Sequence, residues 1–373
     1  MRIYAISLRC FAAFYQVIEL DDVKDWRGAP ARYCFVEKSM QDPLKSRELS
    51  NPDANNDGVD RRGFLECMAW AGTGVLWMMT GGMMKSYGMS QLIDKTTGRL
   101  RNGLVMPASD FSFVQISDSH IGFNKPANPD VVGTLQATID KINGMPAPPS
   151  FVLHTGDLTH LAQADEFDTL DQSLKSVRTE KIFYVPGEHD IADNGKLYME
   201  RFGKGTQGDG WYSFDSHGVH FIGLNNVTNH VDGGLGYIGA DQLKWMDNDL
   251  KGLSASTPIV VFAHIPLWAI YPQWGWGTED SEQALGFLKR FGSVSVLNGH
   301  IHQTIQKVEG NISFHTACST AFPQPAPGSA PSAGPMKVPA EKLRSVLGLT
   351  SVNYIEHNHT LAITDTPLMT ASM

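Results

Sequence analysis

The segment KIFYVPGEHD (residues 181–190) changes from an apolar run to a polar trio within a few positions. Residues 182–185 favour extended backbone, and Pro186-Gly187 ends the run because glycine permits turns that other residues avoid. The polar residues 188–190 follow at once. Open α/β sheets place ligands just beyond the carboxyl ends of their strands. The segment therefore predicts either a functional corner at a strand end or an ordinary solvated loop.

Strand and helix patterns alternate from residue 111 up to this corner. Short apolar runs at 111–116 and 151–156 predict strands like the one at 181–185. Asn128 is expected to cap the first intervening helix and Gly144 to end it. The inner faces of the two predicted helices are Val132, Leu135, Ile139 and Ile142, then Phe167, Leu170, Leu174 and Val177. A βαβαβ order predicts a parallel sheet with helices on its face.

Strand and helix patterns also occur after residue 190. Further strands are predicted at 220–226, 258–264, 294–300 and 312–317, with a helix at about 281–291. The segment 321–339 contains six prolines and is expected to be a loop, because a helix (341–348) and a hairpin (351–363) are predicted after it.

Composition limits the classes of partner. The chain has 373 residues, 42% of them hydrophobic, which suits a large globular body. Its formal net charge of −9 argues against a nucleic-acid polymer as partner, because neutralising a phosphate backbone takes a surplus of Lys and Arg.

The first hundred residues differ in character from the rest. Residues 1–59 are predicted to be a disordered lead, and Met40 is a candidate true start. Residues 60–105 resemble a twin-arginine export signal and linker, with Arg61-Arg62 before an uncharged stretch at 67–84. Export by the twin-arginine machinery to the periplasm or cell envelope is therefore expected, with membrane contact only through this segment if it stays uncleaved. Asp60 and Glu66 depart from the usual flanking residues, and the alternative is a buried helix of the fold.

Carboxylates or imidazoles follow each of five predicted strands. The blocks are QISDSHIGF (115–123), HTGDLTH (154–160), VPGEHD (185–190), VFAHIPLW (261–268) and LNGHIHQ (297–303). In extended backbone, residues two apart point to one side, so the pairs Asp118/His120 and His300/His302 are each expected to converge. One such pair would suit a surface histidine, but five blocks in order indicate a metal site. Oxygen and nitrogen ligands without thiolate favour Mn, Fe or Zn.

As a set, these blocks resemble the signature of the calcineurin-like metallophosphoesterase superfamily, which runs D-x-H, G-D, G-N-H-[DE], H and G-H-x-H. The match extends from Asp118 to His302, about half of the chain. The resemblance implies an α/β fold, an α+β sandwich of two mixed β-sheets flanked by helices in four layers, as a catalytic domain over residues 106–373.

The resemblance also implies a ligand set for two divalent or mixed-valence ions of Mn, Fe or Zn. The implied ligands are Asp118, His120 and His302 for one ion, His264, His300 and Glu188 for the other, and Asp157 as a bridge. Asp157 is expected to give one carboxylate oxygen to each ion and so to fix their separation. The family usually has Asn where this chain has Glu188. Either the glutamate tightens the second site, or its longer arm turns away and leaves that site weak.

The implied reaction is hydrolysis of a phosphomonoester or phosphodiester of a small substrate by a metal-bridging hydroxide. His189 would assist near the leaving group without binding metal, and Asp190 would fix the tautomer of His189. The pattern resembles the cyclic nucleotide phosphodiesterase branch more than the purple acid phosphatase branch, which has a ligating tyrosine at the position of His160. The alternative is a non-hydrolytic metal-binding or phosphate-binding protein with a degenerate site.

Several other polar and aromatic residues have two readings. His160 is predicted to be either a substrate contact or a surface residue, and His154 to be a core residue. The loop LWAIYPQWGWG (267–277) either stacks on a nucleobase or aryl group or is pinned by its own tryptophans. Asn225 or Asn226 could approach the site. The histidines of IEHNHTLAI (355–363) are expected to be exposed strand positions: His357 and His359.

Overall fold

The computed structural model describes residues 111–179, 181–228, 234–355 and 360–369, together with the backbone of five short strands nearer the N-terminus. Most of the predicted disordered lead and of the predicted signal segment lies outside the described residues, as do His357 and His359, but the strands Ile3–Ile6 (β1) and Tyr15–Ile18 (β2) fall within the predicted lead. Three strands, Trp70–Gly72 (β3), Val75–Thr80 (β4) and Met83–Gly88 (β5), fall within the stretch predicted to be an export signal and linker. The export signal stays a prediction.

The described strands form two sheets, each of eight strands. The order in the first sheet is β2 (Tyr15–Ile18), β1 (Ile3–Ile6), β13 (Ile305–Glu309), β14 (Ile312–Thr316), β12 (Val294–Asn298), β11 (Ile259–Phe262), β10 (Val219–Gly223) and β9 (Tyr212–Ser216). The order in the second is β5 (Met83–Gly88), β4, β3, β16 (Thr360–Pro367), β15 (Gly348–Ile355), β6 (Phe111–Ile116), β7 (Phe151–His154) and β8 (Ile182–Tyr184). Both sheets are mixed, as predicted.

Each sheet contains a run of parallel strands, and in the second sheet this run lies at one end. β6, β7 and β8 pair in parallel, which confirms the predicted βαβαβ unit. β10, β11, β12 and β14 also run parallel. The pair β15 and β16 is antiparallel, which confirms the hairpin near the C-terminus. Because parallel strands end at one edge of a sheet, the loops after these strands gather on one side of the molecule.

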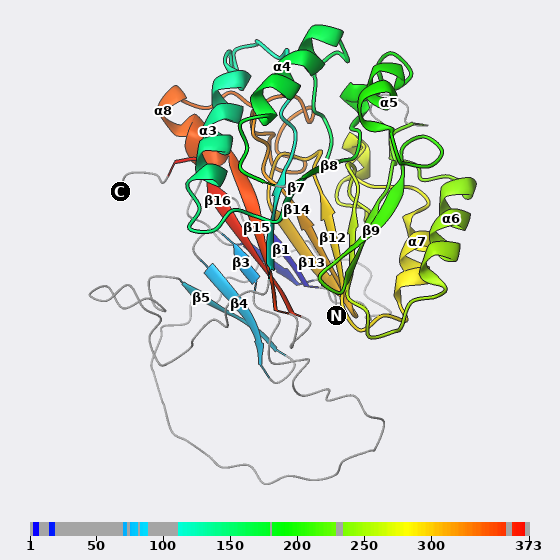
Figure 1. Ribbon diagram of the computed structural model, residues 1–373. Helices are drawn as coiled ribbons and strands as arrows, with labels where there is room; N and C mark the ends of the chain where they lie inside the picture. The colour runs from blue at the N-terminus through cyan, green and yellow to red at the C-terminus, as the bar shows by residue number, and fades with distance from the viewer. Residues whose placement is uncertain are drawn as a thin grey trace, which may run out of the picture.

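Helices cover the outer faces of both sheets (Figure 1). They are α3 (Val131–Asn143), α4 (Ala164–Leu174), α5 (Lys196–Phe202), α6 (Ala240–Leu250), α7 (Ser281–Leu288) and α8 (Ala340–Val346), with single 3₁₀ turns η2 (Glu188–Ile191) and η3 (Pro272–Trp274). The proline-rich segment 321–339 forms no helix or strand, as predicted. In the described part of the chain, no helix is both long and apolar enough to cross a membrane.

Three hydrophobic clusters hold the layers together. Between the sheets, Phe113 stacks on Phe151 with ring centroids 4.9 Å apart, and Phe221 of the facing sheet meets both rings edge-on. A second cluster joins α3 and α4 to their sheet, and a third joins α6 and α7 to the other. Such aromatic edge-to-face pairs are favourable because of the ring quadrupole. The result is the predicted four-layer sandwich.

Helix α3 begins differently from the sequence prediction. Its N-cap is Asp130, whose Oδ1 accepts a hydrogen bond from the backbone amide of Gly133 at 2.8 Å. Asn128 instead accepts from the amide of Asp130 and donates to the carbonyl of Ala321, so it ties the helix entrance to the proline-rich segment. With the helix starting at Val131, that residue is buried and Val132 is 41% exposed. The rest of the predicted inner face is buried, and Gly144 ends the helix as predicted.

Candidate metal centre and active site

The five sequence blocks meet at one edge of the two sheets. Every predicted site residue lies in a turn after a parallel strand: Asp118 and His120 after β6, Asp157 after β7, Glu188, His189 and Asp190 in η2 after β8, His264 after β11, and His300 and His302 after β12. β6, β7 and β8 belong to one sheet and β11 and β12 to the other. The site is therefore assembled across the sandwich.

Left-handed backbone aims these side chains. The φ angles are positive at Asp118 (54°), His120 (42°), Asp157 (49°), His300 (70°) and His302 (52°). The predicted pairs therefore converge through left-handed turns, not through the alternation of an extended strand, which is a correction. Each such residue costs on the order of 1–3 kcal/mol, and such strain clusters at functional sites. Backbone bonds hold the turns: the amide of His120 donates to the carbonyl of Asp157 at 2.9 Å.

The first donor group comprises Asp118, His120, Asp157 and His302. His302 Nε2 lies 3.2 Å from Asp118 Oδ1 and 3.2 Å from His120 Nε2. His120 Nε2 lies 3.4 Å from Asp157 Oδ2. All four side chains are buried. Two imidazole nitrogens that face each other beside two carboxylates make a donor set suited to a cation.

The second donor group comprises Glu188, His264 and His300. Glu188 does not turn away: its Oε1 lies 2.9 Å from His300 Nδ1, and its Oε2 lies 2.9 Å from His264 Nε2. The longer arm of the glutamate thus reaches both histidines of the group. Of the two alternatives left by the sequence, this geometry favours the one in which Glu188 belongs to the second group.

Asp157 stands between the two groups. Its Oδ2 lies 3.4 Å from His120 Nε2 and 3.3 Å from His264 Nε2. Its Oδ1 accepts a hydrogen bond from the backbone amide of His189 at 3.0 Å. One oxygen therefore faces both groups, where the sequence analysis expected one oxygen for each. The reason is that the turn after β8 occupies the other oxygen.

Backbone carbonyls orient two of the histidines. His264 Nδ1 lies 2.7 Å from the carbonyl oxygen of Thr155, and His302 Nδ1 lies 2.6 Å from that of Phe322. In each ring Nδ1 donates to the carbonyl, so Nε2 is the nitrogen that faces the site and, in the neutral ring, the one that can bind a cation. Sequence reasoning missed Phe322. It lies in the loop after β14, and its role rests on a backbone carbonyl, which carries no sequence signal.

Unsatisfied buried atoms occur in both donor groups, and those of the second group support a cation there. In the described structure, His120 Nδ1, His264 Nε2, Glu188 Oε2 and both ring nitrogens of His300 are buried without a hydrogen-bond partner. A buried polar atom without a partner costs about 1–3 kcal/mol, so native proteins seldom leave several together. The short His264–Glu188 approach lacks hydrogen-bond geometry, although its 2.9 Å separation suits two ligands of one ion. The residues present therefore fit two metal ions.

The charges in the site shift the pKa values of its members. Burial alone would raise the pKa of Asp118, but the imidazoles of His302 and His264 outweigh burial and lower it. Burial likewise opposes ionisation of Glu188, but the imidazoles of His300 and His264 outweigh it and bring the pKa of Glu188 well below the usual value. Burial lowers the pKa of His120 well below the usual range, with His189 adding to the effect. The centre thus favours anionic carboxylates and a neutral His120, which are the ligating forms.

Contrary to the sequence analysis, Asp190 does not pair with the His189 ring. His189 Nδ1 lies 2.7 Å from the carbonyl oxygen of His160, so this carbonyl, and not Asp190, sets the tautomer of His189. Asp190 accepts hydrogen bonds from the backbone amides of Leu158, Thr159 and Gly187 and from the Thr159 hydroxyl. The carboxylate faces the backbone because η2 turns the adjacent side chains 188 and 189 toward the site. Burial tends to lower the pKa of His189, but the carboxylates of Asp157 and Glu188 outweigh it and raise the pKa.

Glycines let the loops approach closely. A Cβ added at Gly187 would collide with the carboxylate and amide of Asp157, and one at Gly299 would collide with Ser117 and approach Asp118. Gly187 has a φ of −100°, which any residue can adopt, so the close approach alone requires glycine there.

A pocket of about 370 Å³ opens beside the two donor groups. Four metal-centre residues line it, as does His189: His120, Asp157, Glu188 and His300. The other lining residues are Phe123, Lys125, His160, Trp274, Trp276, Phe322, Gly234, Gln324, Ala333, Gly334 and Pro335. The volume suits a small ligand. Sequence reasoning missed Phe123, Lys125 and Gln324, although the first two adjoin the D-x-H block.

Of the remaining candidates from the sequence analysis, some line the pocket and others support loops or the core. Trp276 is fully buried and meets Trp274 edge-on, so the tryptophan loop is pinned by its own rings while both rings also line the pocket. Asn226 donates to the carbonyl of Ile265, and Asn225 to that of Asp209; both brace loops and neither lines the pocket. His154 is buried against Ser119, as expected of a core residue.

Comparison with known proteins agrees with this architecture. The chain is 26% identical over 218 residues to a 3',5'-cyclic-nucleotide phosphodiesterase of a Nostoc species, covering 57% of this chain and 79% of that protein. It is 26% identical over 168 residues to a protein of Arcobacter nitrofigilis named "probable glycerophosphodiester phosphodiesterase", covering 41% of this chain and 56% of that protein. The fold resembles that of a dimetal phosphatase from Danio rerio, with a TM-score of 0.53, 15% identity, and 70% of this chain and 98% of that chain covered.

A family description also matches the part of the chain that contains the site. The family model named calcineurin-like phosphoesterase matches residues 111–304, from the start of β6 to just beyond His302. The matched region contains every residue of the two donor groups and makes up more than half of the chain. The protein is therefore a member of the calcineurin-like phosphoesterase family.

Proposed function

We propose that the protein is a metal-dependent hydrolase that cleaves phosphomonoester or phosphodiester bonds of a small substrate. The position of Asp157 carries this proposal, because one carboxylate oxygen lies 3.4 Å from a histidine nitrogen of one donor group and 3.3 Å from one of the other. That arrangement suits two ions of Mn, Fe or Zn held close together. Family membership and relatives named as phosphodiesterases support the same reaction class.

In the proposed reaction, different residues of the chain hold the metal ions, orient the histidine rings and supply a proton. When bound, two metal ions would neutralise phosphoryl oxygens and lower the pKa of water so that hydroxide attacks phosphorus. The donor groups fix the ions, and carbonyl oxygens of Thr155 and Phe322 fix the rings of His264 and His302. His189 lines the pocket with Nδ1 engaged by a carbonyl, which leaves Nε2 to serve the leaving oxygen.

The pocket supports a small phosphodiester as the preferred substrate. The relatives named above act, by their names, on a cyclic nucleotide and a glycerophosphodiester. Phe123, Trp274 and Phe322 add apolar surface beside the donor groups, and Lys125 adds a positive charge at the wall. An aryl or nucleobase group beside the phosphate would suit those aromatic faces. Cyclic nucleotide specificity is part of this proposal.

A second candidate function rests on Glu188. Its carboxylate contributes an anion to the second group where the family usually has a neutral amide, and it lines the pocket where the phosphate would bind. Extra negative charge there weakens attraction for an anionic substrate. A metal-binding or phosphate-binding protein without turnover is therefore the alternative. The placement of His189 at the pocket speaks for turnover, because a binding site needs no proton donor.

Export to the periplasm or cell envelope remains a proposal that rests on Arg61-Arg62 and the uncharged stretch behind them. Sequencing the N-terminus of the protein recovered from fractionated cells tests it. A shortened chain, or a full-length chain with its catalytic domain outside the inner membrane, is expected. A full-length chain in the cytoplasm would contradict it.

The enzyme proposal is tested by removing and restoring metal in the full chain. We expect the stripped protein to be inactive and Mn, Fe or Zn to restore hydrolysis of aryl phosphate monoesters, aryl phosphate diesters or cyclic nucleotides. Asp157→Asn should abolish that activity, while Asp140→Asn on the exposed face of α3 should leave it unchanged. Metal binding without turnover of any ester would favour the binding-protein alternative.

A further inference from the structure

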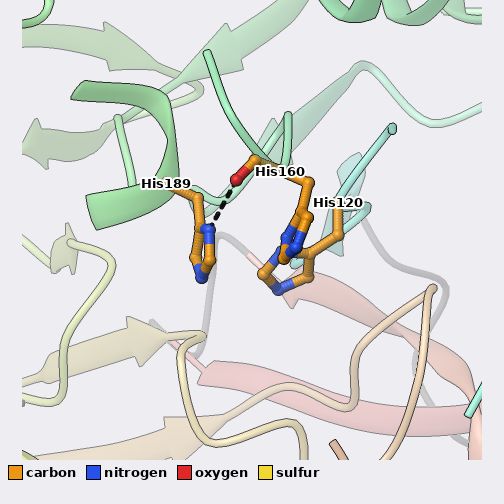
Figure 2. A group of neighbouring side chains, drawn as sticks. All are labelled: His120, His160 and His189. Carbon is orange, nitrogen blue, oxygen red and sulfur yellow. Dashed lines mark hydrogen bonds between the residues drawn. The ribbon is translucent and has the colours of Figure 1, made fainter. Parts of the chain in front are cut away.

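Three histidines form one wall of the pocket: His120, His160 and His189 (Figure 2). The ring of His160 stacks on that of His189, with centroids 4.8 Å apart and planes 20° apart. The ring of His160 also contacts two other rings edge-on, with its centroid 5.2 Å from that of Phe123 and 5.6 Å from that of His120. His160 belongs to neither of the two donor groups around Asp157, so its place in the wall calls for a separate explanation.

A third metal ion does not explain the cluster, although its nitrogens lie close enough to suggest one. The lone pair of an imidazole nitrogen lies in the plane of its ring. Because the rings of His160 and His189 are nearly parallel, their lone pairs run side by side and do not meet at one point. Nδ1 of His189 also donates already to the carbonyl of His160 (Figure 2). The arrangement is one of stacking, not of ligation.

His160 instead holds His189 at two points. Its carbonyl oxygen accepts from His189 Nδ1 at 2.7 Å, which fixes the rotation of the ring and leaves the other nitrogen pointing away from His160. Its own ring covers one face of His189, which fixes the tilt. Nδ1 of His160 is buried and, among the described residues, has no hydrogen-bond partner. The side chain of His160 therefore acts on His189 through its ring face.

We propose that the ring of His160 is a positioning residue for proton donation by His189, an inference that rests on the proposed function. Hydrolysis forms a phosphorus–oxygen bond to water, which gives one proton up to solvent, and breaks the bond from phosphorus to the leaving group. The electron pair of the broken bond stays on the leaving oxygen, and the proton on His189 Nε2 passes to it. His189 then regains a proton from solvent. A ring held in rotation and tilt keeps Nε2 aimed at that oxygen.

The test compares leaving groups of different acidity in the metal-loaded full chain. Aryl methyl phosphates keep the charge and shape of the substrate nearly constant while the phenol varies. We expect His160→Ala to slow hydrolysis of the phenyl ester about 10²-fold, the lower end of general-acid effects, and the 4-nitrophenyl ester far less, because 4-nitrophenolate leaves without a proton. His160→Phe keeps the stacking face and the carbonyl, so it should behave like the wild type. His189→Ala removes the acid itself, so the slope of its hydrolysis rate against the acidity of the leaving phenol is the reference for the other variants.

A second readout does not depend on turnover. In the metal-free protein, the Nδ1–H proton of His189 should give a slowly exchanging NMR signal in the wild type and in His160→Phe, and exchange should speed up in His160→Ala. Equal losses on both esters, or a His160→Phe variant that matches His160→Ala in slope and exchange, would overturn the inference while leaving the hydrolase intact. If the wild type hydrolyses no ester, the proposed function fails, and the inference fails with it even where the exchange result holds.

Discussion

Asp190 receives two hydrogen bonds from Thr159, one from its backbone amide at 2.8 Å and one from its hydroxyl at 2.9 Å. The same carboxylate accepts from the amides of Leu158 and Gly187. Thr159 and Leu158 follow β7, whereas Gly187 and Asp190 follow β8. Asp190 is fully buried, so it joins two site loops from within. It supports the position of Asp157 and His189 instead of touching the His189 ring.

Removing this carboxylate should destabilise the protein. Asp190→Ala leaves three buried amides without an acceptor, each worth about 1–3 kcal/mol, so a loss of at least about 3 kcal/mol is expected. Chemical denaturation of the metal-free protein measures this free energy of unfolding. Thr159→Val, which removes only the hydroxyl bond, should cost less than Asp190→Ala. A stability change below about 0.5 kcal/mol for Asp190→Ala, the range of an ordinary surface substitution, would show that the loop connection is unimportant.

Gly187 should tolerate no side chain. Gly187→Ala pushes a methyl group against the carboxylate and amide of Asp157, which shifts the bridging oxygen. We expect activity to fall about 10²-fold, as for other small displacements of reacting groups, and the free energy of unfolding to fall by about 1–3 kcal/mol. Steady-state kinetics and denaturation measure the two effects.

Gly286→Ala is the matched control for that substitution. Gly286 lies on the exposed side of α7, and an added Cβ there would meet nothing within 4 Å. Alanine at this position should raise the free energy of unfolding by up to about 1 kcal/mol because it is the better helix former. Activity should stay at the wild-type level. If both glycine variants lost activity equally, crowding of Asp157 could not be the cause.

A histidine far from the site should make stability depend on pH. His220 lies 2.8 Å from Asp215 and 2.9 Å from Asp249, and burial, which lowers its pKa, is outweighed by these carboxylates so that its pKa is raised. A raised folded-state pKa means that the protonated form stabilises the fold. The contribution is complete below about 6.5, the unfolded-state pKa, and disappears as pH rises through the folded-state pKa.

His220→Gln should therefore lower the free energy of unfolding most at acid pH. We expect a loss of about 1.5–3 kcal/mol at low pH, the usual range for a hydrogen bond to a charged group, and a smaller loss at alkaline pH. Denaturation of both proteins across the pH range supplies the difference curve. Asp249→Asn should give a curve of the same sign. A difference that grows with rising pH would contradict the assignment.

Glu188 should set the affinity of the second donor group for metal. Glu188→Asn removes an anionic ligand that lies 2.9 Å from both His264 and His300. Because affinity depends on ligand charge, we expect the second ion to bind at least about tenfold more weakly while the first is little changed. Chelator competition on the variant and the wild type measures both affinities. Unchanged binding of both ions would place Glu188 outside the metal centre.

Much of the fold and of the site could be predicted from the sequence because both depend on patterns of neighbouring residues. Alternating apolar runs gave the strands, and polar residues at their ends gave the donor groups. The exact cap of α3 could not be predicted, since Asn128 and Asp130 are both good caps. Their roles are decided by the bond from Asn128 to Ala321, which is distant in sequence.

Side-chain direction within the site was beyond sequence reasoning. Asp190 follows His189 in a motif that suggests a hydrogen-bonded pair, but η2 turns the two side chains apart. The orienting carbonyls of His160 and Phe322 carry no sequence signal, because every residue has a carbonyl. Only the packing of the loops after β7 and β14 reveals which ones face a histidine.

The most direct test of the central claim is electron paramagnetic resonance of the wild-type full chain loaded with Mn²⁺, with the bound metal counted in the same sample. We predict two Mn²⁺ ions per chain and a spectrum of exchange-coupled ions, because ions that share the Asp157 oxygen would lie about 3.5–4 Å apart. A single bound ion, or two ions that give only the six-line signal of isolated Mn²⁺, would contradict a dinuclear centre bridged by Asp157.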